Sequence, residues 1–172
     1  PFNGREENSE KDLRVRQNYA AMLENIDRNI GLLMDEVKKR GELNNTIIIY
    51  SSDHGEMLGD FGKYSKMIPE RGSTKIPLVI SGPGIRKGIC CDELIELQDL
   101  TATIIDYVGA TMSEAKDSIS LRPLLESKTN IHREYQVSSL YSWNMISNKE
   151  YKLIIEKNKK IRLYSLENDP WE

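Results

Sequence analysis

Two adjacent side chains that can bind a metal ion follow an apolar run near the middle of the chain. Thr46–Tyr50 is apolar and rich in isoleucine, and Asp53, His54 and Gly55 come shortly after it. A carboxylate oxygen and an imidazole nitrogen can share one divalent cation, and glycine lets the backbone turn sharply beside a bound group. The segment therefore has the residue types for metal-assisted chemistry on a charged ester.

Each of these side chains also has a structural interpretation. Asp53 can be an ordinary turn acid, and His54 a partly exposed residue at a strand end. Lys63, Lys66 and Lys75 lie nearby, and a single lysine in a loop is usually only solvated. Their combination at the carboxyl edge of a parallel sheet would nevertheless suit a tetrahedral oxyanion ester, because a cation offsets charge on its non-bridging oxygens.

Two apolar runs must hold this loop at the edge of a sheet. Thr46–Tyr50 and Ile76–Ser81 predict buried strands, and residues 52–66 form the loop that carries the candidate ligands. Upstream, a long helix is expected, with Ser9 as its N-cap and Gly41 as the residue just after its end. A helix followed by a short turn and an apolar strand indicates half of an α/β crossover, whose parallel sheet holds active sites at its carboxyl edge. The apolar stripe of the helix comprises Leu23, Ile26, Ile30, Leu33 and Val37.

The chain downstream of these strands predicts smaller elements. Leu94–Leu97 is expected to be a short strand or extended segment, and Asp99 to cap a helix that stops near Gly109. Residues 120–125 predict one helical turn. His132 lies in a polar run and is interpreted as a surface residue.

The last part of the chain changes to short β-type runs at close spacing. They are Glu134–Leu140, Trp143–Ser147, Tyr151–Ile155 and Ile161–Ser165. The predicted fold class is therefore α/β, with a sheet and helices over residues 1–128 and a small antiparallel β-meander subdomain over residues 129–172.

Composition excludes some classes of function. The 172 residues include 24 lysines and arginines against 27 acids, well mixed along the chain, so no basic stripe indicates a nucleic-acid partner. No apolar run approaches the roughly 20 residues of a membrane span, and no signal-peptide pattern opens the chain. Localisation stays open between export and the cytoplasm. Because the chain starts at Pro1, we expect a processed product or a piece of a larger protein.

A series of motifs in one order runs through nearly the whole chain. Together they resemble the type I sulfatases of the alkaline-phosphatase-like superfamily. The motifs are Tyr19–Asp35, Ser52–Asp60 (SDHGEMLGD), Lys66, Lys75–Ile80, Ser81–Ile85 (SGPGI), Leu97–Ile104, Ser120–Leu125 (SLRPLL), Tyr151–Ile154 and Leu163–Glu172.

This resemblance implies a partial alkaline-phosphatase-like sheet and hydrolysis of a sulfate monoester. It implies Asp53 and His54 as ligands of a divalent metal, Ca²⁺ first and Mg²⁺ or Mn²⁺ as alternatives. Lys66 would contact the sulfate, with Lys63 the next candidate. Three departures affect statements about substrate. Many members have a histidine at the position of Phe61, Tyr-Glu at Glu70-Arg71, and arginine at Lys75.

The formylglycine nucleophile that the resemblance implies has no source in this chain. It is made from the motif Cys/Ser-x-Pro-x-Arg, which Cys90–Glu93 does not fit, and Ser81–Ile85 has isoleucine where arginine must stand. The chain therefore resembles the C-terminal portion of a sulfatase. By itself we expect it to be inactive, to bind metal weakly, and to self-associate through exposed sheet edges.

Two other interpretations stay open. A phosphodiester or phosphonate monoester hydrolase of the same superfamily can share the Asp-His-Gly triplet and its flanking strands. A non-catalytic binding module could keep the same shell without the chemistry. For a sulfatase, an aryl sulfate, a sulfated sugar, choline sulfate or another sulfate ester all fit.

Overall fold

The chain divides into two compact units in a computed structural model that describes residues 10–111 and 117–172. The first unit consists of the residues up to Lys66 together with Gly72–Pro83. The second consists of Met67–Arg71 together with Gly84–Glu172. The predicted domain boundary at residue 128 stays a prediction.

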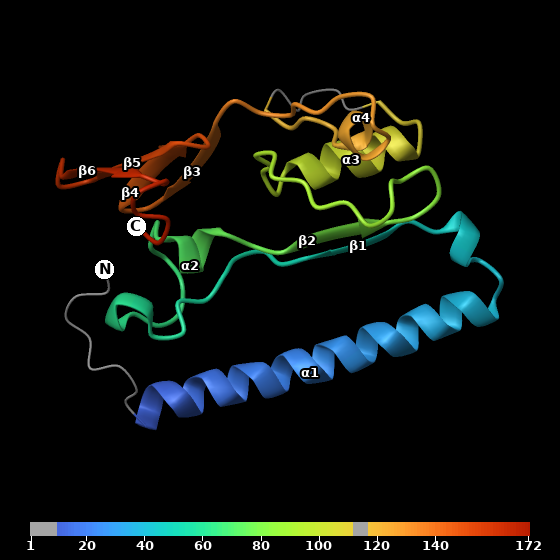
Figure 1. The fold of residues 1–172 in the computed structure, drawn as a ribbon, viewed down its shortest axis with the longest axis horizontal. Helices are drawn as coiled ribbons and strands as arrows, with labels where there is room; N and C mark the ends of the chain where they lie inside the picture. The colour runs from blue at the N-terminus through green and yellow to red at the C-terminus, as the bar shows by residue number, and fades with distance from the viewer. Residues whose placement is uncertain (1–9, 112–116) are drawn as a thin grey trace. The chain divides into compact units, whose positions relative to one another are not determined.

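The first unit begins with a long helix, α1 (Glu10–Lys39), whose end charges explain where it starts and stops (Figure 1). Acidic residues occupy its first turn, and Lys38 and Lys39 its last, so each charge opposes the nearer end of the helix dipole. Gly41 has a φ of +71° and ends the helix. The predicted helix is confirmed, while its proposed N-cap, Ser9, lies outside the described residues.

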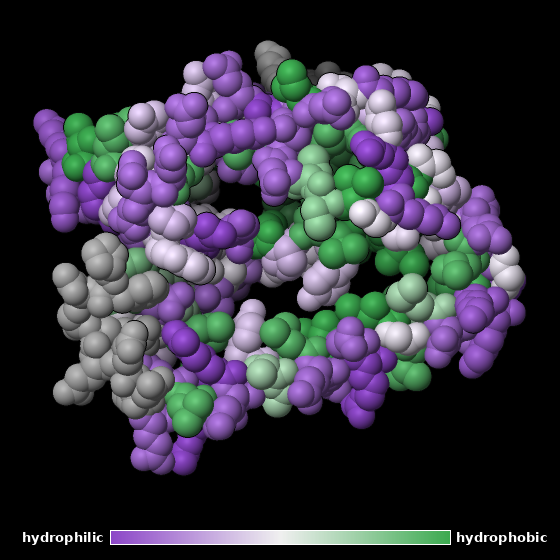
Figure 2. Space-filling view, viewed as in Figure 1, coloured by the Kyte–Doolittle hydropathy of each residue, from purple (hydrophilic) through white to green (hydrophobic). Residues whose placement is uncertain are grey.

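The apolar stripe predicted for α1 is largely open to solvent. Leu23 and Ile26 are each 43% exposed and Leu33 is 64% exposed. Figure 2 accordingly shows hydrophobic surface along this helix. Among the described residues no helix, α1 included, is both long and apolar enough to cross a membrane. The predicted self-association stays a prediction.

Strands β1 (Ile48–Ser51) and β2 (Leu78–Ser81) pair as an antiparallel sheet with Ser51 opposite Leu78. The parallel arrangement expected for these two runs is therefore wrong. The hydroxyl of Ser51 donates to the carbonyl of Pro77 at 2.9 Å, which holds the two ends of the connecting segment together. Because the chain leaves β1 and enters β2 at the same edge, no crossover helix is needed.

Short helical turns occur between these longer elements. The 3₁₀ turn η1 (Leu43–Asn45) joins α1 to β1. The loop between the strands contains the 3₁₀ turn η2 (Asp60–Gly62) and the short helix α2 (Arg71–Thr74).

The second unit confirms the predicted meander. Its four strands pair antiparallel in chain order, and β4 (Trp143–Ser147) alternates buried and exposed residues. Trp143, Met145 and Ile154 form its buried core. Leu94–Leu97 is irregular and forms no strand. The elements of this unit are α3 (Asp99–Tyr107), α4 (Arg122–Leu125), β3 (Gln136–Leu140), β4 (Trp143–Ser147), β5 (Tyr151–Glu156) and β6 (Ile161–Ser165).

Asp99 joins three segments of the second unit. Its fully buried carboxylate accepts the backbone N–H of Glu96 at 3.0 Å and that of Ile119 at 2.8 Å. His132 Nε2 lies 3.0 Å from the same carboxylate, and Arg133 Nε donates to it at 2.9 Å. The His132 side chain is only 3% exposed, so its interpretation as a surface residue is wrong. The N-cap role predicted for Asp99 is also wrong, because its carboxylate binds groups outside α3.

The bonds to Asp99 predict a loss of stability in acid. Burial by itself would raise its pKa, but Arg133, the backbone N–H groups of Ile119 and Glu96, and His132 together lower the pKa to about 2. Because the pKa is lower in the folded state, the ionised Asp99 stabilises the fold at pH values above its unfolded pKa, near 3.8. This stabilisation is lost as the pH falls toward 2. This group should contribute about 2 kcal/mol. Urea unfolding should show that the Asp99→Asn variant is less stable than wild type at pH 5. At pH 2 the difference in free energy of unfolding should be smaller by about 2 kcal/mol. A constant gap would contradict the prediction.

Candidate active site

The two candidate metal ligands follow the end of β1 directly. β1 ends at Ser51, and Asp53 and His54 lie two and three residues further on. The Asp53 side chain is 81% exposed and that of His54 is 39% exposed. Both side chains are therefore accessible to an ion from solution, unlike the buried acids of the second unit.

Local hydrogen bonds orient both ligands. His54 Nδ1 lies 2.8 Å from the carbonyl of Gly55, and because a carbonyl only accepts, this nitrogen carries the proton. The lone pair of neutral His54 is then on Nε2, which lies 3.6 Å from Oδ2 of Asp53. The other oxygen, Oδ1, accepts the backbone N–H of His54 at 3.0 Å. One carboxylate oxygen and one ring nitrogen thus lie close together, and the second ring nitrogen is held as in metal-binding histidines.

This pair suits one divalent cation but does not complete its coordination. Two ligand atoms bound at about 2.3–2.6 Å can lie adjacent on an ion when they are a few ångströms apart, as Asp53 Oδ2 and His54 Nε2 are. Calcium takes about six to eight oxygen ligands. In the part of the chain that the structure describes, no group of three or more His, Cys, Asp or Glu side chains could hold a metal. Asp53 and His54 are thus a candidate pair with no third described side chain of these types beside them.

Gly55 is required by the close approach of another segment. Its N–H donates to the carbonyl of Ser73 at 2.8 Å, and a Cβ at this position would lie 2.1 Å from the carbonyl oxygen of Gly72. No side chain fits there without displacing the backbone. The turn that presents Asp53 and His54 thus depends on the residues that lead into β2.

Alanine substitutions at two glycines should have opposite effects on stability. Gly55→Ala should lower the free energy of unfolding by about 1–3 kcal/mol, because the new methyl group overlaps the Gly72 carbonyl. Gly31→Ala is the matched control, since nothing lies within 4 Å of a Cβ there and the residue is inside α1. It should raise stability by about 0.5–1 kcal/mol. Equal effects in thermal and urea unfolding would refute this explanation.

Glu56 follows the turn that carries the candidate ligands (Asp53–Gly55, the ligand turn) and binds Ser65, the residue before Lys66. Its carboxylate accepts the backbone N–H of Ser65, and also that of Leu58 at 3.3 Å. The N–H of Met57 in turn donates to the carbonyl of Ser65 at 3.0 Å. Glu56 lies within the SDHGE motif, but sequence reasoning assigned it no role. The only signal for such a role in the sequence was an acidic residue close to the two candidate ligands.

Lys66 itself is exposed and directly follows this held residue. Among the described residues, no hydrogen bond or ion pair joins its side chain to Asp53 or His54. Lys63 is exposed too, but its backbone N–H bonds back to Asp60 within the 3₁₀ turn. Ser65, the residue before Lys66, is thus bonded to Met57, whereas the backbone N–H of Lys63 is bonded within its own turn.

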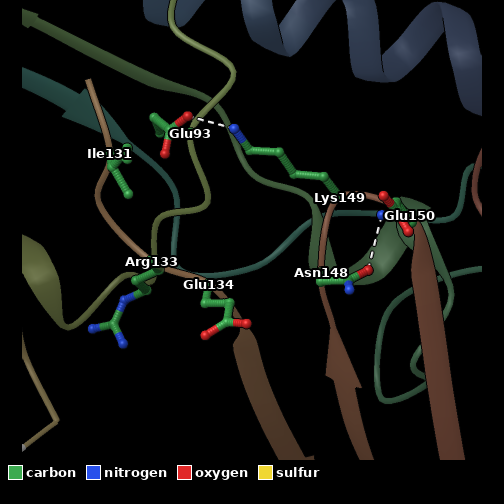
Figure 3. A pocket seen from close by; sticks show the side chains of 7 residues that line it. All are labelled: Glu93, Ile131, Arg133, Glu134, Asn148, Lys149 and Glu150. Atoms are coloured by element: carbon green, nitrogen blue, oxygen red, sulfur yellow. Dashed lines mark hydrogen bonds and ion pairs between the residues drawn. The ribbon is translucent and has the colours of Figure 1, made fainter.

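The second unit contains an open pocket of about 280 Å³ (Figure 3). Its two basic side chains are already bonded, Lys149 to Glu93 and Arg133 to Asp99. The Lys149 ammonium and a backbone N–H hold the pKa of Glu93 below its usual value. The described lining therefore offers no cation for a free anion. It consists of Glu93, Ile131, Arg133, Glu134, Asn148, Lys149 and Glu150.

Comparison with known proteins adds family evidence to this geometry. The family model "Sulfatase" matches residues 2–110, and "N-sulphoglucosamine sulphohydrolase, C-terminal" matches residues 59–172. An arylsulfatase of Clostridium perfringens is 30% identical over 168 residues, which cover 92% of this chain and 35% of that protein. The chain thus spans about a third of the length of this relative.

Solved structures show the same relationship. A structure solved in complex with its substrate, D-glucosamine-2-N,6-O-disulfate, superimposes with a TM-score of 0.83 at 29% identity, covering 88% of this chain and 34% of that one. The phosphonate monoester hydrolase of Agrobacterium radiobacter superimposes with a TM-score of 0.82 at 25% identity, covering 91% and 36%. The predicted alkaline-phosphatase-like α/β fold is confirmed. Since one family model covers well over half of its residues, the chain belongs to the sulfatase family.

Proposed function

We propose that this chain is the C-terminal part of a sulfate ester hydrolase and supplies part of its active site. Asp53 and His54 would bind a divalent cation, most simply Ca²⁺, and Lys66 would contact the sulfate group. The observation that carries the proposal is the 3.6 Å approach of Asp53 Oδ2 and His54 Nε2 on accessible side chains just after the end of β1. Sulfatases generally work with a metal ion and a formylglycine, and the formylglycine would come from outside this chain.

The residues of this chain would divide the electrostatic work. When bound, the metal ion would polarise the sulfate and stabilise negative charge near the nucleophile. Asp53 would supply a carboxylate oxygen to hold the ion, and His54 the ring nitrogen Nε2, the ring being held by the bond of Nδ1 to the Gly55 carbonyl. The Lys66 ammonium would offset charge that builds up on the non-bridging sulfate oxygens. Glu56 would keep the backbone before Lys66 close to the ligand turn through Ser65.

The family indicates a sulfate ester as the substrate class, and the similar structures suggest which esters to test first. A sulfated amino sugar is the substrate bound in one similar structure, so glucosamine sulfates belong in the first substrate panel with aryl sulfates. Phosphonate monoester hydrolysis is the second candidate function, favoured by the similarity to the Agrobacterium enzyme. A sulfate monoester and a phosphonate monoester each carry a single negative charge, so only their relative turnover by the same enzyme distinguishes the two functions.

Activity should require more than this chain. We expect the full-length enzyme to hydrolyse sulfate esters, and the isolated 172-residue chain to show no turnover, because it lacks the Cys/Ser-x-Pro-x-Arg nucleophile motif. The measurement is turnover of 4-nitrophenyl sulfate, glucosamine sulfates and a phosphonate monoester by both proteins with Ca²⁺, Mg²⁺ and Mn²⁺. Faster phosphonate turnover would favour the second function. Hydrolysis by the isolated chain would contradict the expectation, and binding without any turnover by the full-length protein would indicate a binding module.

A further inference from the structure

The loop of residues 58–65, which lies between the ligand turn and Lys66, has an unfavourable backbone conformation at several positions. Leu58, Phe61 and Ser65 have φ values of +48°, +52° and +67°, which are in the left-handed region. This region is unfavourable for residues other than glycine, because Cβ comes too close to the following carbonyl oxygen. Such residues keep the conformation only where surrounding groups hold them, and they are common at functional sites. The contacts of the loop therefore decide its shape.

One side chain of α1 binds this loop at two places. Arg16 Nε donates to the carbonyl of Leu58 at 3.1 Å, and Arg16 Nη2 donates to Oδ1 of Asp60 at 3.0 Å. The two acceptors lie on either side of Gly59, where the 3₁₀ turn η2 begins. A planar guanidinium that binds two acceptors fixes their relative position, whereas a partly exposed ion pair adds little stability. The contribution of Arg16 is therefore mainly to the geometry of the loop.

A second side chain of α1 binds the end of the loop. The hydroxyl of Tyr64 donates to the carboxylate of Asp12, and Lys11 Nζ lies over the Tyr64 ring, 4.7 Å from its centroid. Asp12 is only 8% exposed, although the apolar stripe of the same helix is largely open to solvent. An exposed acid in the first turn would oppose the helix dipole equally well, so the dipole does not explain this burial. A buried carboxylate needs a hydrogen-bonded partner, and Tyr64 is one.

The two residues before Lys66 are thus both held. Tyr64 is bonded to α1, and Ser65 is bonded to Met57 and Glu56, which follow the ligand turn. All of these groups belong to the first unit, as Lys66 does. Two different segments of one compact unit therefore fix the backbone that leads to Lys66.

We propose that Arg16 and Asp12 are positioning residues for Lys66. This inference rests on the proposed function, in which Lys66 contacts the sulfate. Arg16 holds the start of the loop and its 3₁₀ turn, and Asp12 holds the end of the loop through Tyr64. Positioning matters because a displacement of about 1 Å in a substrate-contacting group can lower a rate by about 100-fold.

The test uses variants of the full-length enzyme that each remove one donor group. Arg16→Met removes the guanidinium and keeps an unbranched side chain, and Tyr64→Phe removes the hydroxyl and keeps the ring. Each should lower kcat/KM for the sulfate ester about tenfold, mainly through kcat. Arg14→Met and Tyr141→Phe are the matched controls and should keep wild-type kinetics. Arg14 is exposed on the same helix and pairs only one turn away, with Glu10, and Tyr141 is 77% exposed.

The decisive measurement repeats these changes in the Lys66→Ala background. Arg16→Met and Tyr64→Phe should then lower kcat/KM less than about twofold, because the group through which they act is gone. Either variant carries this test if the other does not fold. A full tenfold loss in that background would show that the variants act by another route, and would overturn the inference.

The single variants separate this inference from the proposed function. Wild-type kinetics of Arg16→Met and Tyr64→Phe beside a defective Lys66→Ala would overturn the inference alone. Wild-type kinetics of Lys66→Ala would overturn the proposed sulfate contact, and the inference with it.

Discussion

Replacing Lys66 with alanine in the full-length enzyme is expected to lower kcat/KM for a sulfate ester by about 10²- to 10³-fold. A cation that meets the non-bridging oxygens acts most strongly where charge accumulates in the transition state. The loss should therefore fall mainly on kcat, and correspond to about 2.7–4 kcal/mol of transition-state stabilisation. Lys66 is exposed and no charged partner binds it among the described residues, so its removal should leave the free energy of unfolding nearly unchanged.

Lys63 and Lys75 provide matched controls for this result. Both are exposed lysines of the same loop, and alanine at either position should change kcat/KM by less than about threefold, as for solvated surface charges. Steady-state kinetics of the three variants, with unfolding curves for each, would separate a contact from general electrostatics. A larger loss in Lys63→Ala than in Lys66→Ala would reassign the sulfate contact.

Replacing Asp53 with alanine is expected to weaken divalent-cation binding by at least about 100-fold. Changes to groups behind metal ligands already cost about 10- to 100-fold in affinity, and Asp53 would supply the charged ligand itself. Its side chain is 81% exposed, so the substitution should not disturb packing. Calorimetric titration of the chelator-treated full-length protein with Ca²⁺ measures the affinity directly. The Ca²⁺ concentration needed to restore turnover gives a second measure of the same binding.

The same titration includes a variant of the second candidate ligand, His54, and a control variant at Asp35. His54→Ala should weaken cation binding about tenfold or more, because one of the two directed ligand atoms is lost. Asp35→Asn, an exposed acid of α1, should bind the cation as wild type does. If Asp53→Ala kept wild-type affinity, Asp53 and His54 would be a structural turn in which the ring simply faces the carboxylate.

The orientation of the candidate ligands could be predicted only in part. The sequence places Asp53 and His54 after an apolar run, and this order already locates them at a strand end. It does not show which ring nitrogen of His54 is free, because that depends on the turn that brings the Gly55 carbonyl to Nδ1. The strand direction was mistaken for a similar reason. Apolar runs predict strands, but pairing depends on bonds such as Ser51 to Pro77.

Local patterns determined most of the elements of this protein. The helix α1 follows from an apolar repeat of 3.6 residues and opposite charges at its ends, and the meander from alternating residues between polar turns. Motif order along the chain determined the family. Each helix or strand signal acts over a few residues, and the order of the motifs is itself a property of the sequence, so the amino-acid sequence contains both directly.

Tertiary structure alone decided which distant groups meet. His132 was expected on the surface, yet it is buried against Asp99, 33 residues away. Trp143 and Lys152 lie in a meander whose own pattern explains their strands, but not their bonds to Met67 and Pro69. Such contacts depend on how chain segments pack, and periodicity within one segment has no information about its partner. The contacts that hold Met67 and Pro69 are therefore a property of the fold, whereas the residue types that make them are a property of the sequence.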